Sequence, residues 1–354
     1  MQRRSPICHI IPPHILRKLA ENPEHRDSAL RTIAINERLR GRRAVLEQFM
    51  GLAVSPGGKR RTIYDAQHAL TESGLPGKLV RGEGSPASKD IAVNEAYDFS
   101  GNTYDFYQQV FNRNSIDGKG MRLDSSVHFN VDYDNAFWDG QQMVYGDGDR
   151  QFFDRFTKCL DVVGHELTHG VTASTAALNY DGQSGALNES MSDVFGVLVK
   201  QKTLGQAANK ADWLIGKGLF LPGVQGDALR SMAAPGSAYD DPNIGKDPQP
   251  ATMKNYVNTT DDNGGVHINS GIPNHAFYLA AMKIGGNAWE KAGLIWYITL
   301  TQRLTSTSNF QDAADTTYAV AGEQFGSGSL EQQAVSDAWR QVGINVPSRA
   351  VAAD

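Results

Sequence analysis

The stretch LDVVGHELTHGVTAS, residues 160–174, places two histidines four positions apart, with a glutamate directly after the first. On a helical period of 3.6 residues, His165 and His169 lie on one face, one turn apart. Two imidazoles in this arrangement can occupy two positions of a tetrahedral zinc ion. Glu166 lies beside them and can reach a water molecule on that metal. The alternative is a solvated helix with a coincidental spacing, so the interpretation requires a third ligand.

A second stretch, GALNESMSDVFG at residues 185–196, supplies a candidate for that ligand. Its apolar residues recur with a helical period, which places Asn188, Glu189, Ser192 and Asp193 on one face. A polar face within an apolar helix is costly unless it meets partners, and a zinc site provides them. We therefore expect Glu189 to be the third ligand and Asp193 to hydrogen-bond the free ring nitrogen of a ligating histidine. The alternative is a surface helix with ordinary charges.

Two further polar side chains can stabilise charge near such a metal. In DDNGGVHINSGI, residues 261–272, a tight turn precedes His267, and Asp262 lies five residues before it. A histidine held by a carboxylate suits the stabilisation of negative charge that develops on a reacting oxygen. The alternative is a structural histidine in a turn. Tyr180, between the two metal-binding helices, offers another donor near the zinc.

The segment YDNAFWDG, residues 133–140, is predicted to be an edge strand that contains Asn135 and Ala136. An unpaired strand edge can take an extended peptide by main-chain pairing, and the Asn135 side chain can hydrogen-bond that peptide. Arg230 lies in the apolar neighbourhood GDALRSM, where a buried guanidinium usually needs a carbonyl or carboxylate partner. These residues predict a binding site for peptide backbone.

The composition is that of an ordinary soluble globular protein. The chain has 354 residues, of which 40% are hydrophobic and 21% charged, and this length favours about two domains. No apolar run approaches the ~18 residues of a membrane span, and the N-terminus has no apolar core typical of a secretory signal peptide. The two cysteines, Cys8 and Cys159, exclude a disulfide framework. We therefore expect no membrane association.

Charge is unevenly distributed along the chain. Residues 1–61 carry 13 Lys and Arg against 5 Asp and Glu, whereas the remainder carries 21 against 34. A basic arm can bind nucleic acid or a membrane surface, but this one lacks the interleaved aromatic residues of a nucleic-acid-binding arm and precedes an acidic body. We therefore favour an arm that lies against the rest of its own chain and expect no nucleic acid partner.

The elements expected along the chain form three groups. Residues 14–50 have a helical pattern that is broken near Pro23, and GLAVSPGGKRR, residues 51–61, is a flexible break that suits processing. From residue 62 to about residue 149, short strands dominate: TIYDA, IAVNEAYDF, SSVHFNVDY and QQMVYGDGD, with a helix at TYDFYQQVFNR. Helices follow at 161–176, 186–203, 271–285, 289–304, 309–325 and 331–342. This order predicts an α+β fold with a β-rich half, a mainly helical half and a cleft between them.

Taken together, the segments HELTH, GALNESMSDVFG, NAFW, MVYGDGD, LRSM and DNGGVHINSGI are similar to those of the thermolysin-like zinc metalloproteases, from about Thr62 to the C-terminus. The resemblance implies a two-domain fold and endopeptidase action on proteins and peptides. It implies that one catalytic zinc is held by His165, His169 and Glu189, and that Glu166 is the general base. It implies that Tyr180 and His267 stabilise the oxyanion, with Asp262 orienting His267, and that Asn135, Ala136 and Arg230 bind substrate backbone. Glu166 and the three ligands are all present, which argues against an inactive, peptide-binding relative.

The resemblance also implies a pocket for the side chain that follows the scissile bond. Its lining maps to six apolar residues: Phe153, Phe156, Val162, Ile215, Leu219 and Leu229. An apolar pocket favours Leu, Ile, Val or Phe, so cleavage is expected on the amino side of bulky hydrophobic residues.

The N-terminal segment differs from that of thermolysin and resembles the short propeptide of the protealysin subgroup, through its motif IIPPHIL. This resemblance implies a self-inhibited, self-processing precursor. Its expected parts are a propeptide at 1–52, a β-rich catalytic domain at 53–175 that ends in the zinc-binding helix, and a helical catalytic domain at 176–354. Cleavage is expected within EQFMGLAVSPGG, where Phe49, Leu52 and Val54 suit the apolar pocket.

Cys8 is a possible zinc ligand in the precursor, because a thiolate binds zinc well and would displace the catalytic water. The alternative is a free cysteine near a terminus, with inhibition through steric blockage by Ile10, Ile11 and Pro12. Nothing in the sequence fixes the distance between Cys8 and the metal.

The family's double calcium site is predicted to be absent. The matching positions read Asp161, Lys200, Asp212, Leu214 and Lys217. Calcium needs six to eight oxygen ligands, and ammonium groups would repel it. We expect the two lysines to pair with the two aspartates instead. Asp227 retains one acid of another calcium site of the family, which is weak evidence for that site.

The resemblance favours a secreted monomer, although no classical signal peptide is seen. Cytoplasmic synthesis followed by non-classical export, or intracellular action, is the alternative.

Overall fold

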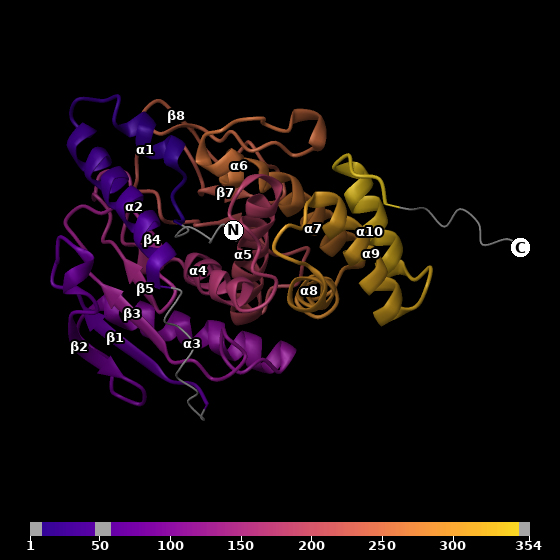
Figure 1. The fold of residues 1–354 in the computed structure, drawn as a ribbon, viewed down its shortest axis with the longest axis horizontal. Helices are drawn as coiled ribbons and strands as arrows, with labels where there is room; N and C mark the ends of the chain where they lie inside the picture. Colours follow the sequence, from indigo (N-terminus) through magenta and orange to yellow (C-terminus); the bar gives the residue numbers. More distant parts are fainter. Residues whose placement is uncertain (1–8, 47–57, 347–354) are drawn as a thin grey trace, which may run out of the picture.

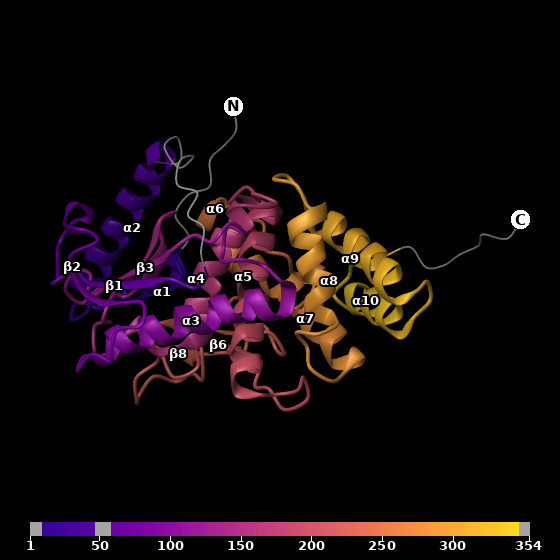
Figure 2. The same cartoon turned by 90° about the horizontal axis from the view of Figure 1, so that it is seen from below.

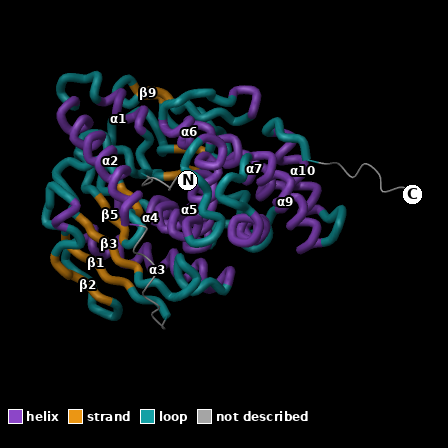
Figure 3. The backbone as a smooth tube through the Cα atoms, viewed as in Figure 1, coloured by secondary structure: helices purple, strands orange, loops and turns teal. Residues whose placement is uncertain are grey.

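The computed structural model describes residues 9–46 and 58–346. As expected, a sheet-containing N-terminal half precedes a mainly helical half (Figures 1 and 3). The five strands of the main sheet are β1 (Arg61–Asp65), β2 (Lys78–Gly82), β3 (Leu123–Val127), β4 (Ala136–Trp138) and β5 (Gln142–Tyr145). Their order is β2-β1-β3-β5-β4, so β4 forms one edge, as predicted for the NAFW segment. The pairs β1–β3 and β3–β5 are parallel, and both edge strands pair antiparallel.

Helix α3 (Ile91–Phe111) lies on one side of this sheet and α2 (Arg26–Leu46) lies on the other (Figure 2). The prediction of a strand at IAVNEAYDF was wrong, because this segment forms the first half of α3. The β-branched Ile91 and Val93 suggested a strand. However, the Asp90 side chain caps the helix by accepting from the backbone N–H of Ala92, and buried residues recur at helical spacing.

The C-terminal half is built around α4 (Leu160–Ala173) and α5 (Gly182–Leu204), as predicted from their apolar periodicity (Figure 1). Its other helices are α6 (Asp262–Asn269), α7 (Gly271–Ile284), α8 (Ala292–Ile298), α9 (Phe310–Phe325) and α10 (Leu330–Gln341). Two small antiparallel pairs complete it: β6 (Leu214–Ile215) with β7 (Arg230–Ser231), and β8 (Asp240–Asp241) with β9 (Gly245–Lys246). Among the described residues, no helix is long and apolar enough to cross a membrane.

The N-terminal segment forms α1 (Pro13–Leu19) and α2, and the interruption between them contains Pro23, as predicted. In α1, Ile15, Leu16 and Leu19 are almost completely buried. In α2, Ile35 and Leu39 join a small apolar cluster with residues from the outer sheet face and nearby loops, namely Ala66, Phe129, Tyr133, Phe137 and Val144. The basic arm therefore lies against the body of its own chain.

Two glycines allow α4 and α5 to approach closely. A Cβ atom on Gly164 would lie 3.1 Å from the Cα atom of Gly196. A Cβ atom on Gly196 would lie 2.5 Å from the carbonyl oxygen of Asp161 and 3.0 Å from the backbone nitrogen of His165. These neighbours are backbone atoms, so they cannot rotate away. The backbone contact fixes the separation at which side chains of the two helices meet.

We predict that Gly196→Ala separates these helices. The substitution should lower the free energy of unfolding by about 1–3 kcal/mol, as overpacking of a tight contact does, and should weaken metal binding. The measurements are chemical denaturation and metal content after dialysis. Gly322→Ala in α9 is the matched control, because the atoms nearest to its Cβ atom would belong to the flexible side chain of Gln332 rather than to backbone. Equal stability of the two variants would contradict the assigned role of Gly196.

Candidate metal centre

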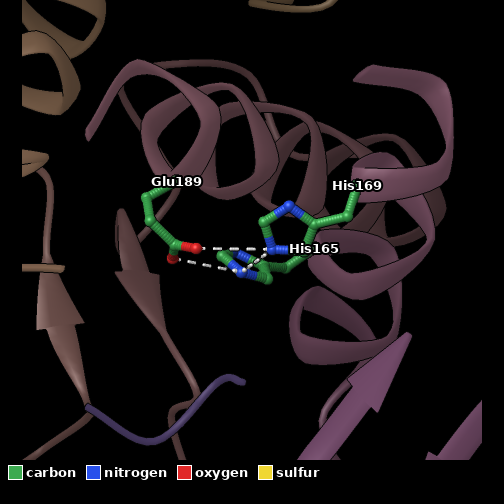
Figure 4. A group of neighbouring side chains, drawn as sticks. All are labelled: His165, His169 and Glu189. Atoms are coloured by element: carbon green, nitrogen blue, oxygen red, sulfur yellow. Dashed lines mark hydrogen bonds and ion pairs between the residues drawn. The ribbon is translucent and has the colours of Figure 1, made fainter. Parts of the chain in front are cut away.

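Three potential ligand atoms converge where α4 and α5 cross (Figure 4). The Nε2 atoms of His165 and His169 lie 3.1 Å apart, and each lies 3.5 Å from a carboxylate oxygen of Glu189. All three residues are at most 2% exposed. Within the described part of the chain, they are the one group of three or more His, Cys, Asp or Glu residues whose ligand atoms lie within 4.8 Å of one another.

The hydrogen bonds behind the two imidazoles show that this group fits a cation. The Nδ1 atom of His165 lies 2.7 Å from Oδ1 of Asp193, and Nδ1 of His169 lies 2.9 Å from Oδ1 of Asn188. These oxygens are acceptors, so each Nδ1 carries the hydrogen and each Nε2 of the neutral rings presents a lone pair. Two lone pairs and a carboxylate that face one another repel unless a cation lies between them. Two nitrogens and one oxygen form a donor set that suits zinc and leaves a fourth position open.

Asp193 joins the metal centre to Arg230. Both side chains are buried, and the guanidinium donates to both carboxylate oxygens of Asp193, at 2.8 Å each. Burial alone would raise the pKa of Asp193, but Arg230 and His165 together hold it below its usual range. Asn274 donates to the same carboxylate at 2.9 Å. Asp193 therefore stays ionised and fixes the tautomer of His165.

His267 lies close to the ligands and is held by Asp262, as the sequence predicted for this pair. Its Nδ1 is 2.7 Å from Oδ1 of Asp262, and its backbone N–H donates to Oδ2 at 2.9 Å. Residues 262–265 have left-handed backbone conformations, and this turn brings the Asp262 carboxylate to the imidazole of His267. Burial opposes the charged form, but Asp262 and Glu189 raise the pKa of His267 above its ordinary value. Tyr180 lies 3.2 Å from Nε2 of His267 and also donates to Glu189.

Glu166 is completely buried beside the first ligand. Its Oε2 accepts a hydrogen bond of 3.2 Å from the backbone N–H of Trp138, at the end of β4. This contact connects the helix that carries the metal ligands to the strand at the sheet edge.

Residues 9–11 of the N-terminal segment lie along β4 in the antiparallel direction. The backbone N–H of Ile10 donates to the carbonyl of Ala136 at 3.3 Å, and that of Ile11 donates to Oδ1 of Asn135 at 3.0 Å. The carbonyl of Ile10 accepts from Arg230 at 3.2 Å. The predicted backbone-binding residues are therefore brought together, and they hold an extended stretch of the protein's own chain.

One carbonyl of this stretch reaches the metal centre. The oxygen of His9 lies 2.9 Å from Nε2 of His267, which in turn lies 3.6 Å from Oε2 of Glu189. His9 and Ile10 are almost completely buried. The six residues predicted to line the apolar pocket are also at most 1% exposed and belong to the same apolar cluster as Ile10: Phe153, Phe156, Val162, Ile215, Leu219 and Leu229.

Helix α1 is also held against the C-terminal half by polar contacts. Nε2 of His14 lies 2.7 Å from the hydroxyl of Tyr239, and Arg17 pairs with Asp261 at 3.1 Å. Burial lowers the pKa of His14 from 6.5 to about 4; Asp262 opposes this shift, while His267, Arg230 and Arg17 add to it. The neutral imidazole therefore accepts the hydrogen bond from Tyr239.

Lys200 and Lys217 pair with the two aspartates, as predicted. Lys200 lies 2.8 Å from Asp161 and 3.1 Å from Asp212, and donates to the carbonyl of Leu214 at 2.6 Å. Lys217 pairs with Asp212 at 3.5 Å. The Lys200 ammonium group thus contacts three of the oxygens that a cation would need.

Several sequence predictions lie outside the described residues. These are the possible ligation of the metal by Cys8 and the cleavage region around Phe49, Leu52 and Val54.

Sequence reasoning assigned no role to some residues that support the site. Asn188 and Ser192 were placed on the polar face of their helix, but both also approach Nδ1 of His169, at 2.9 and 3.1 Å. Their positions, one residue before and three residues after Glu189, were the sequence signal that could have identified them. Asn274 and Tyr239 come from distant segments, and no local pattern connects them to the metal ligands.

The chain matches two family models. The one described as thermolysin metallopeptidase, catalytic domain, covers residues 56–173, and the one described as thermolysin metallopeptidase, alpha-helical domain, covers residues 176–344.

Two similar proteins and a solved structure agree with these matches. An extracellular metalloprotease of Pectobacterium carotovorum subsp. carotovorum is 50% identical over 345 residues, which cover 96% of this chain and 97% of that protein. Protease PrtS of Photorhabdus sp. (strain Az29) is 46% identical over 351 residues, which cover 95% and 92%. The structure of the precursor of protealysin, a metalloproteinase from Serratia proteamaculans, is 53% identical with a TM-score of 0.86, covering 95% of this chain and 99% of that one.

We predict that Asn188→Ala weakens metal binding about 10- to 100-fold, as loss of a partner behind a metal-ligating histidine typically does. The amide would no longer fix the tautomer of His169. Competition with a chromophoric chelator measures the affinity. Ser192→Ala is the comparison and should have a smaller effect, because its contact is longer. An unchanged affinity in Asn188→Ala would contradict this role.

Proposed function

The chain belongs to the thermolysin family of zinc metalloendopeptidases, and we propose that it is a latent precursor that cleaves peptide bonds on the amino side of bulky hydrophobic residues. The observation that carries this proposal is the position of residues 9–11. They lie extended along the sheet edge, with one carbonyl beside His267 and the metal-binding group. Such a site accepts an extended polypeptide and places one of its peptide bonds at the metal.

His165, His169 and Glu189 are assigned as the zinc ligands. Zinc bound there supplies a Lewis acid that polarises a carbonyl and lowers the pKa of a bound water. Asp193 orients the imidazole of His165 through Nδ1. Glu166 is assigned as the general base that takes a proton from water and delivers it to the leaving amine.

Tyr180 and His267 are assigned to stabilise the oxyanion that develops on the substrate carbonyl. Burial disfavours the charged form of His267, but Asp262 accepts from Nδ1 and raises the pKa of the ring, which favours donation from Nε2 to the substrate carbonyl. A donor that is already oriented costs no reorganisation when negative charge develops on that oxygen.

Asn135, Ala136 and Arg230 are assigned to bind the substrate backbone. The preference for an apolar residue after the scissile bond rests on the six buried apolar residues assigned to its pocket: Phe153, Phe156, Val162, Ile215, Leu219 and Leu229. A charged side chain there would be desolvated without a partner, which is costly.

Latency is assigned to the N-terminal segment, which we take to comprise residues 1–52. Residues 9–11 use the same backbone groups that a substrate needs, so substrate and segment compete for one cleft. Removal of the segment by self-processing would open the cleft.

We assign residues 53–175 and 176–354 as the two catalytic domains. We further propose that the protein acts outside the cell as a monomer, in line with the extracellular metalloprotease to which it is similar.

We predict that Glu166→Gln lowers the rate of casein hydrolysis roughly 10²- to 10⁴-fold while zinc remains bound, because it removes the base and no ligand. The measurements are casein digestion with and without a zinc chelator, and zinc content. Glu290→Gln, which changes an exposed glutamate, is the control and should match wild type. Near-normal turnover in Glu166→Gln would refute the mechanism. Maturation of that variant alone, without added protease, would refute self-processing.

We predict that calcium does not stabilise this protein through Asp161 and Asp212, because the Lys200 ammonium group lies between these carboxylates. Calcium in place of a calcium chelator should therefore not raise the unfolding temperature through this site. Lys200→Met should lower the free energy of unfolding by roughly 3 kcal/mol, since Asp161 would be left buried without a counter-charge. Lys210→Met at an exposed lysine is the control. A calcium-dependent rise in the wild-type unfolding temperature that Asp161→Asn removes would show that the site persists.

We predict that acidification loosens α1 through His14. The pKa of this histidine is about 4 in the docked state and 6.5 when exposed, so the released segment binds protons more tightly. Its contribution to docking is complete above about pH 6.5 and is lost as the pH falls toward 4. At pH 5 docking should be about 20-fold weaker than at pH 7. His14→Gln keeps a neutral acceptor for Tyr239 and should flatten this dependence.

Hydrogen exchange of the amides of residues 14–19 in the Glu166→Gln precursor measures the opening of α1 without interference from proteolysis. Comparison with Glu166→Gln/His14→Gln at each pH separates His14 from other acidic transitions. Identical pH profiles for the two proteins would exclude His14 as the cause.

A further inference from the structure

The peptide bond between His9 and Ile10 lies in the cleft where a substrate bond would be cleaved. We propose that the protein hydrolyses this bond in its own chain, and that the resulting form, beginning at Ile10, is still latent. This inference rests on the proposed endopeptidase function and adds a processing site to it. The expected junction between propeptide and catalytic domain is a different and later cleavage site.

The hydrogen bonds fix which bond is presented. The carbonyl oxygen of His9 accepts from His267, the group assigned to the oxyanion, so the carbonyl carbon of His9 is the one exposed to attack. The next nitrogen, of Ile10, donates to the carbonyl of Ala136, and the next carbonyl accepts from Arg230. A shift of one residue in either direction would place a different carbonyl beside His267 and break this pairing.

The side chain after this bond also has the expected polarity. Ile10 is apolar, and its side chain is 0% exposed in the main hydrophobic core, which also contains the six assigned pocket residues. Ile11 continues the extended backbone by donating to Asn135. The segment therefore offers both the backbone contacts and the apolar residue expected of a substrate.

The reaction is a hydrolysis that consumes one water. The hydroxyl of the water forms a bond to the carbonyl carbon of His9, and the bond between this carbon and the nitrogen of Ile10 breaks. His9 becomes a C-terminal carboxylate, and Ile10 gains a proton as a free amine. Glu166 is placed next to the first metal ligand to carry that proton, so no further reactant is required.

Latency should survive this cleavage because the anchors lie on the C-terminal side of the bond. Helix α1 buries Ile15, Leu16 and Leu19, and α2 contributes Ile35 and Leu39 to the cluster on the sheet. Only residues 1–9 are freed, while Ile10 and Ile11 remain in the cleft. As long as they do, the junction near residues 47–57 cannot enter the same cleft, so the junction must be cleaved by another molecule or after release.

The test follows intact mass and the new N-terminus of freshly purified, zinc-loaded precursor over time. We expect a species that begins at Ile10, formed at a rate independent of protein concentration, before casein hydrolysis increases. Cleavage at the junction should accelerate with concentration. Glu166→Gln should yield neither product. Ile10→Leu should retain the first cleavage, and Ile10→Asp should lose it.

A precursor that matures at the junction while the bond between His9 and Ile10 stays intact overturns this proposal and leaves the peptidase function standing. A protein that hydrolyses neither its own chain nor casein overturns the proposed function instead. A concentration-dependent first cleavage would show that the segment is cut by another molecule and would also overturn the proposal.

A measurement without zinc tests the binding register separately. In metal-stripped precursor, the amides of Ile10 and Ile11 should be protected from hydrogen exchange, and Asn135→Ala should raise the exchange rate at Ile11 at least tenfold. Equal exchange of Ile11 in wild type and variant would refute the register on which the cleavage site depends.

Discussion

The metal centre depends on one ionised carboxylate that is completely buried. Asp193 is stable there because Arg230 donates to both of its oxygens and because His165 and Asn274 donate as well. An unpaired charge at this depth would cost several kcal/mol. The same pair connects two tasks, because Arg230 also holds the carbonyl of Ile10 while Asp193 fixes the imidazole. Metal ligation and peptide binding are therefore coupled through one ion pair.

The parts of the site that could be predicted from the sequence are those encoded locally. The spacing of His165 and His169 on one helix, and of Glu189 and Asp193 on another, follows from the helical period alone. The prediction also assumed that α4 and α5 face each other. The close contact between Gly164 and Gly196 explains why they do. The order of strands and helices was predicted correctly for most of the chain for the same reason, since each long helix shows its own apolar periodicity.

The rest depends on contacts between distant segments. Asn274 lies 81 residues from Asp193, and His14 lies 225 residues from Tyr239, so neither pair leaves a pattern in the sequence. The first half of α3 was misassigned because short apolar runs with β-branched residues fit both a strand and a helix. The register of the N-terminal segment along β4 could not be predicted either. A shift by one residue would place a different carbonyl beside His267, but no feature of the sequence distinguishes the two registers.

The contacts that keep the N-terminal segment in place and the residues that act on substrate lie in different parts of the molecule. The hydrogen bonds of residues 9–11 contribute about 1 kcal/mol each, and a substrate makes the same bonds, so they give the segment no advantage. Each buried aliphatic side chain of α1 and α2 contributes about 1.5–3 kcal/mol, and a short substrate peptide has no such helices. The advantage of the segment over a substrate therefore comes from its helices and from covalent attachment. Changes on the faces of α1 and α2 can alter how long the precursor stays latent without altering a residue that acts on the substrate.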